Sequence, residues 1–217
     1  MIFPDTAEKK PLIVVAHGAG GQASWHCRHW HGFIGNDAIL LCPRGRRQYA
    51  RDPSKGYYFP DHPSLGREVL AALAALRLQA GSKIASGPVT YAGYSQGATM
   101  GALAFASDDN PFQRLVLVEG GVSDWSLARA KKFCASGGRR VLLVCGTNRC
   151  WAHARAARDL LHRADVEVRA VAALGQGHRP DGGVGRVLVE SLPWLFQGDT
   201  RYPERGYVYP DPWETGP

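Results

Sequence analysis

Short apolar runs alternate along the chain with segments whose apolar residues recur every three or four positions. Continuous apolar runs are typical of strands buried on both faces, and the longer spacing is typical of helices that cover them. The runs predict strands at residues 12–16, 38–42, 88–92, 114–119, 140–145 and 166–173. Helices are predicted at residues 64–80, 98–106, 127–134, 151–163 and 185–196. This alternation predicts an α/β fold with a mostly parallel sheet of about six strands.

The length of 217 residues suits a single α/β domain, with a core over about residues 12–196 and a surface tail over 197–217. No apolar run is long enough to span a bilayer. The first residues lack the charged and apolar regions of a secretory signal, so we expect a cytoplasmic protein, with a secreted mature form as the alternative.

The net charge of +7 raises the question of a nucleic-acid partner. Such a surface needs basic residues gathered on one face, with aromatic residues between them. The one tight cluster consists of Arg44, Arg46, Arg47 and Arg51. The other basic residues are scattered, which favours solvated surface arginines, and we expect no nucleic-acid partner.

Cysteines and histidines could form disulfides or a metal site. The five cysteines permit at most two internal disulfides, and spacing alone does not tell paired from free thiols; they are Cys27, Cys42, Cys134, Cys145 and Cys150. His26, Cys27, His29 and His31 cluster, but the second ligand pair of a structural zinc site is missing. We therefore expect no metal.

The motif Gly93-Tyr94-Ser95-Gln96-Gly97 directly follows a predicted strand and precedes a predicted helix. In this context the serine lies on a sharp turn that lifts its hydroxyl above the sheet, and the flanking glycines let neighbouring backbone pass close by. Ser95 is the predicted nucleophile.

A glycine-rich turn, His17-Gly18-Ala19-Gly20-Gly21, follows the first strand. It lacks the residue order of dinucleotide and phosphate-binding loops. Its free amides instead suit a developing oxyanion in acyl transfer. We predict the Ala19 amide as one donor, with Gly20 next, and the Gln96 amide as the other.

A serine hydroxyl needs a base to become a good nucleophile. His178 follows the last predicted strand in Gly175-Gln176-Gly177-His178. Because it comes after Ser95 in the chain, the order matches that of the serine–histidine enzymes with this turn. His178 is the predicted base.

With these motifs in this order, the chain resembles the α/β-hydrolases, in layout the compact dienelactone-hydrolase and phospholipase/carboxylesterase-like members. The resemblance spans about residues 12–196. It implies a Ser-His-acid triad that hydrolyses a carboxylic ester through an acyl-enzyme, without a cofactor. Thioester or peptide hydrolysis on the same triad is an alternative, as is a catalytically impaired hydrolase fold used for binding.

The chain departs from this family at the triad acid. Members carry it in a Gly-Thr-x-Asp pattern, where this sequence reads Gly146-Thr147-Asn148-Arg149. Arginine has only donors and cannot accept the histidine N–H. Glu119 ends the preceding strand, where pancreatic-type lipases place their acid, and it is the predicted substitute. Asp124, Asn148 or the absence of an acid are the alternatives.

About twenty residues separate Glu119 from Arg139, too few for a large helical lid, so we expect an open site. Gly20, Tyr94, Trp125 and Trp151 are predicted to contact the substrate. Short or medium acyl esters suit an open site best, with aromatic esters or polyesters as further options.

Overall fold

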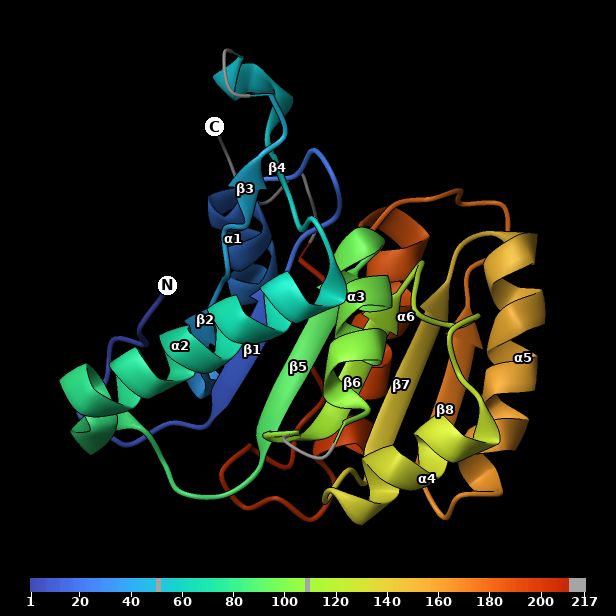
Figure 1. Ribbon diagram of the computed structural model, residues 1–217. Coiled ribbons are helices and arrows are strands. Elements are labelled where there is room, and N and C mark those ends of the chain that lie inside the picture. The colour runs from blue at the N-terminus through green and yellow to red at the C-terminus, as the bar shows by residue number, and fades with distance from the viewer. Residues whose placement is uncertain (50–51, 108–109, 211–217) are drawn as a thin grey trace.

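A parallel sheet of six strands runs through the computed structural model, which describes residues 1–49, 52–107 and 110–210 (Figure 1). The strand order is β2-β1-β5-β6-β7-β8, which confirms the predicted fold class. The strands are β1 (Leu12–Ala16), β2 (Ile39–Leu41), β5 (Val89–Tyr94), β6 (Phe112–Val118), β7 (Arg140–Cys145) and β8 (Glu167–Ala172).

Helices cover both faces of this sheet (Figure 1). One face is covered by α2 (His62–Ala80), α3 (Gln96–Phe105), α4 (Leu127–Ala135) and α5 (Asn148–His162). The other is covered by α1 (Ala23–Ile34) and α6 (Gly182–Phe196). Alternate residues of β1 face the two sides, with Val14 in the first core cluster and Val15 in the second. Both faces are therefore apolar, as the continuous runs predict.

The sheet has a switch point between β1 and β5. From β1 the chain passes through α1 to the edge strand β2, then returns to β5 on the other side of β1. Ala16 pairs with Gly93, so these two strands end side by side. The connections that follow them run in opposite directions, which leaves a crevice at the carboxyl edge, where open α/β sheets bind ligands.

A small hairpin of β3 (Arg46–Arg47) and β4 (Tyr57–Tyr58) stands beyond this edge of the sheet (Figure 1). It was not predicted, because two-residue strands are too short to show a hydrophobic period. Short 3₁₀ turns occur at Gly35–Asp37, Pro53–Lys55 and Gly81–Lys83. Arg51 of the arginine cluster lies outside the described residues.

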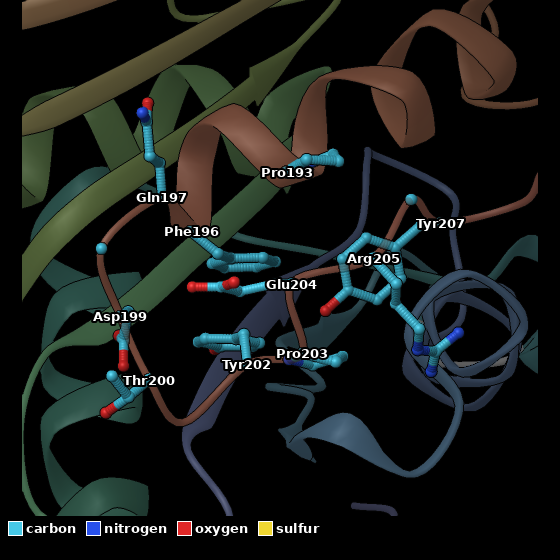
Figure 2. Close-up of a pocket in the computed structure, with 12 residues that line it drawn as sticks. Pro193, Phe196, Gln197, Asp199, Thr200, Tyr202, Pro203, Glu204, Arg205 and Tyr207 are labelled. Carbon is cyan, nitrogen blue, oxygen red and sulfur yellow. The ribbon is translucent and has the colours of Figure 1, made fainter.

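The segment after α6, which was predicted as a surface tail, is attached to the core by two tyrosines. Tyr202 stacks on Phe196 with ring centroids 3.7 Å apart, and Tyr207 meets Phe196 edge-on. Both tyrosines are buried and belong to the second core cluster (Figure 2). The core therefore extends past Phe196, because these rings remove large apolar areas from water. A cavity of about 400 Å³ lies among these residues.

Buried charges fasten this segment to the sheet. Asp199 accepts hydrogen bonds from Arg114 on β6 at 2.8 Å and from Arg201 at 2.6 Å. Burial raises the pKa of the Asp199 carboxyl, but hydrogen bonds from Arg201 and Arg114 outweigh it and lower the pKa to about 2. The ionised carboxylate therefore stabilises the fold.

Among the described residues, no helix combines the length and the apolar character needed to cross a bilayer.

We expect Asp199→Asn to lower the free energy of unfolding by about 3 kcal/mol, because it leaves two arginines around a neutral amide. The ionic contribution is complete above the unfolded pKa of about 3.9. In wild type it should be lost as the pH falls from about 4 toward about 2. Urea unfolding across this pH range measures both effects. As a control, Glu167→Gln removes an exposed partner of Arg140 and should cost less than about 1 kcal/mol. Equal losses in the two variants would contradict this account.

Candidate active site

The residues that follow β5 and β6 are each fastened to the end of the neighbouring strand. The Ser95 amide donates to the Val118 carbonyl at 2.8 Å, and the Glu119 amide donates to the Val144 carbonyl at 2.9 Å. His178 lies in the connection between β8 and α6. The parallel sheet thus brings residues from three distant parts of the chain to one edge.

Ser95 occupies the sharp turn between β5 and α3. Its φ of 50° and ψ of −113° are unusual for a residue with a side chain. The flanking glycines allow the turn. A Cβ on Gly93 would lie 2.6 Å from the Ala98 nitrogen, and one on Gly97 would lie 2.6 Å from the Ala16 oxygen. Both positions therefore need glycine for close backbone packing.

A continuous series of hydrogen bonds joins Ser95, His178 and Glu119. The Nε2 atom of His178 lies 2.8 Å from Ser95 Oγ, and its Nδ1 atom lies 3.0 Å from Glu119 Oε2. With the proton on Nδ1, the ring donates to Glu119 and accepts from the serine hydroxyl. The Glu119 side chain is 1% exposed and that of His178 is 53% exposed. The carboxylate is thus shielded from solvent, whereas the imidazole is about half exposed to solvent.

The other candidates for the acid do not reach the imidazole in the described part of the chain. Asp124 makes no hydrogen bond to His178, its Oδ2 atom is buried without a partner, and burial raises its pKa. Asn148 begins α5, and no hydrogen bond joins it to His178 either. Arg149, in the first turn of α5, lines a cavity beside His178. Glu119 is therefore the carboxylate that the fold brings to the ring.

The Glu119 carboxylate is held by the turn between β7 and α5. Its Oε1 atom accepts from the Gly146 amide and, at 3.0 Å, from the Thr147 amide. The Thr147 hydroxyl lies 3.1 Å from Oε2. Hydrogen bonds to an ionised group are among the stronger ones, so they compensate much of the cost of burying this charge.

Two of the predicted amide donors are free. The amides of Ala19 and Gln96 have no acceptor among the described residues, whereas the Gly20 amide donates to the Tyr57 carbonyl at 2.9 Å. The Gln96 side chain accepts from the Phe59 amide at 2.9 Å. The β4 segment thus holds both the glycine-rich turn and Gln96, a role that sequence reasoning missed.

Tyr94 supports the segment that carries His178. Its hydroxyl donates to the His178 carbonyl at 2.9 Å, and its ring lies 5.4 Å from the imidazole. His26 stacks on the same tyrosine. Burial, with His29 and His17 nearby, lowers the pKa of His26 to about 3, and burial raises that of Tyr94 to about 12. Both therefore stay neutral around pH 7, and neither is suited to accept a proton from Ser95.

The cavity beside His178 has a volume of about 370 Å³, and its lining includes Thr99, Gly120, Val122, Thr147, Arg149 and His153. Two predicted substrate contacts lie elsewhere. Trp125 is buried and packs edge-on against Phe133. Trp151 packs against the same core cluster. We therefore do not propose these tryptophans as substrate-binding residues.

The structure pairs four of the five cysteines, as Cys27–Cys42 and Cys145–Cys150, and leaves Cys134 free. Within the described ranges, the one group of potential metal ligands consists of Glu119, Cys145 and Cys150. A disulfide offers no thiolate, so this group does not fit a metal. The histidines of α1 do not form such a group there.

No family model matches the sequence, and no curated protein matches it. Many solved structures match the fold, however. The esterase PE8 superimposes with a TM-score of 0.68 at 18% identity, over 89% of this chain and 96% of that one. A carboxylesterase from Mesorhizobium loti gives 0.59 at 19% identity, over 85% and 89%. A phospholipase/carboxylesterase from Dyadobacter fermentans gives 0.55 at 15% identity, over 84% and 88%.

The chain has the α/β-hydrolase fold. This finding confirms the fold that the resemblance implies. At identities this low, the similarity concerns the fold, and the chemistry must be argued from the residues of the site.

We expect Gly93→Ala to lower the free energy of unfolding by about 3 kcal/mol, because the new methyl group would overlap the start of α3. Gly66→Ala in α2 is a matched control, since its methyl group would meet Ala104 at 3.7 Å. The control should stabilise the protein by about 0.5–1 kcal/mol through its gain in helix propensity. Denaturant unfolding measures both, and a Gly93→Ala variant as stable as wild type would contradict the account of this turn.

Proposed function

We propose that this chain is a serine hydrolase that cleaves carboxylic esters through an acyl-enzyme intermediate. The observation that carries the proposal is the hydrogen-bonded series from Ser95 through His178 to the buried Glu119. The free amides of Ala19 and Gln96 add to it. The names of the similar structures, esterase and carboxylesterase, favour an ester as the substrate.

In acylation, Ser95 Oγ attacks the acyl carbon while His178 Nε2 takes the hydroxyl proton. Glu119 keeps the proton on Nδ1 and stabilises the imidazolium that forms. The developing oxyanion accepts hydrogen bonds from the Ala19 and Gln96 amides. His178 then returns the proton to the leaving alcohol, and the serine ester is left.

In deacylation, water takes the place of the alcohol. His178 Nε2 removes a proton from the water as its oxygen attacks the serine ester. The same two amides hold the second oxyanion. Collapse releases the carboxylic acid, and the proton passes from His178 back to Ser95 Oγ.

The surroundings of His178 affect which esters can enter the site. Its side chain is half exposed, and the chain between β6 and β7 carries α4 as its one helix, which packs with α5. The site is therefore open. Short or medium acyl esters could enter directly, and an aromatic ester or a polyester chain could lie across the opening.

The two disulfides provide information on the cellular compartment of the protein. Disulfides persist in oxidising compartments and are rare in the cytosol, where thiols are kept reduced. Cys27–Cys42 and Cys145–Cys150 thus weigh against the cytoplasmic location expected from the sequence. We infer that the enzyme works outside the cytosol.

We expect wild type to hydrolyse p-nitrophenyl acetate and butyrate. Ser95→Ala should lower kcat at least about a thousandfold, because it removes the nucleophile. Glu119→Gln should lower kcat by about 10²- to 10⁴-fold, because an amide does not hold the imidazole in the reactive tautomer. The rate of p-nitrophenol release gives kcat for wild type and both variants.

Asp124→Asn is the control for the choice of acid, and its rate should stay within about threefold of wild type, because Asp124 does not contact His178. A full rate for Glu119→Gln would remove Glu119 from the mechanism. Inactive, folded wild type would instead favour a hydrolase fold used for binding.

A further inference from the structure

The turn between β7 and α5 contacts one member of the proposed triad, Glu119, and the backbone next to another, His178. Its Gly146 and Thr147 donate to Glu119, as described above. Gly146 also packs against the His178 segment, since a Cβ on Gly146 would lie 2.4 Å from the Gly177 oxygen. In this chain the turn carries no acid of its own and instead receives the carboxylate of the neighbouring strand.

The Cys145–Cys150 disulfide closes this turn. It joins the last residue of β7 to the first turn of α5, with Cα atoms 5.5 Å apart and a sequence separation of five. Both cysteines are buried, and their sulfur atoms lie within 4.8 Å of the Glu119 carboxylate. The donors to Glu119 thus stand inside the loop that the disulfide closes.

Thr147 connects the Cys150 end of this loop to Glu119. Its hydroxyl is close enough to donate to Glu119 Oε2 and accepts from the Cys150 amide at 3.2 Å, which makes Thr147 the N-cap of α5. A hydroxyl can do both because it has one proton and two lone pairs. The start of α5, the disulfide and the carboxylate therefore form one connected unit.

We propose that the Cys145–Cys150 disulfide and Thr147 are positioning residues, which keep the Glu119 carboxylate aligned with His178 Nδ1. This inference rests on the proposed function. Glu119 has a φ of 51° and a nearly fully buried side chain, so its alignment depends on fixed donors rather than on solvent. A closed loop restricts those donors to few conformations, and small losses of alignment lower the rate strongly.

The second disulfide offers a matched control. Cys27–Cys42 joins α1 to the end of β2, and Cys27 lies in the second core cluster. Within the described residues, neither cysteine contacts Ser95, His178 or Glu119 through a hydrogen bond or ion pair. Its removal should therefore affect stability but not the alignment of the triad.

We expect Cys145→Ala/Cys150→Ala to lower kcat for p-nitrophenyl butyrate by about 10- to 100-fold, with KM changed less than about threefold. Cys27→Ala/Cys42→Ala should keep kcat within about threefold. The decisive experiment introduces Cys145→Ala/Cys150→Ala into the Glu119→Gln variant. If the turn acts through Glu119, the added change should lower kcat less than about threefold there.

Thr147 gives a second test that does not depend on the disulfide. Thr147→Val keeps the shape but removes the hydroxyl, and should lower kcat about tenfold. Thr147→Ser keeps the hydroxyl and should restore kcat to within about twofold of wild type. Circular dichroism and unfolding curves verify that the compared variants are folded.

Three results would overturn the inference while leaving the proposed function intact. They are a Cys145/Cys150 variant at full rate, an equal loss of rate in the wild-type and Glu119→Gln backgrounds, and a Thr147→Val variant as fast as Thr147→Ser. A full rate for Glu119→Gln alone would instead overturn the choice of acid, and the inference with it.

Discussion

The buried carboxylate of Glu119 links the loops that follow β6, β7 and β8. It accepts from Gly146 and Thr147 on one side and lies 3.0 Å from His178 Nδ1 on the other. A charge this deeply buried is costly unless its hydrogen-bonding capacity is used. The same contacts that stabilise the charge therefore also fix the imidazole that faces Ser95. In the proposed mechanism, the alignment of the triad and the stability of the fold depend on the same set of hydrogen bonds.

In the proposed triad the acid lies one strand away from the Gly-Thr-x-Asp position that the resemblance implies, and the parallel sheet allows this placement. Strands β6 and β7 pair in register up to Val118 and Val144, so the residues that follow them are neighbours at the carboxyl edge. A carboxylate that extends from the end of β6 can therefore occupy the space beside the β7 turn. With arginine at position 149, that turn supplies donors in place of an acid. The proposed triad would thus perform the same chemistry with a different acid.

The sequence predicted the parts of this site that depend on local pattern. The Ser95 turn follows from glycine spacing between a strand and a helix. Glu119 follows from a carboxylate at the end of an apolar run together with the resemblance to pancreatic-type lipases. Contacts between distant segments left no such signal. The support of Gly20 by Tyr57 and the burial of Tyr202 depend on tertiary packing, and the paired cysteines could equally have been free. The extent of the domain stays a prediction.

The most direct test of the central claim is labelling by a fluorophosphonate, read by intact mass and by mapping of the modified peptide. This reagent reacts with a serine only where a neighbouring base activates the hydroxyl and amides accommodate the oxyanion. We expect a single adduct on Ser95 in wild type, none in Ser95→Ala, and much slower labelling in Glu119→Gln. Wild type that stays unlabelled, or an adduct on a different residue, would contradict the proposed triad.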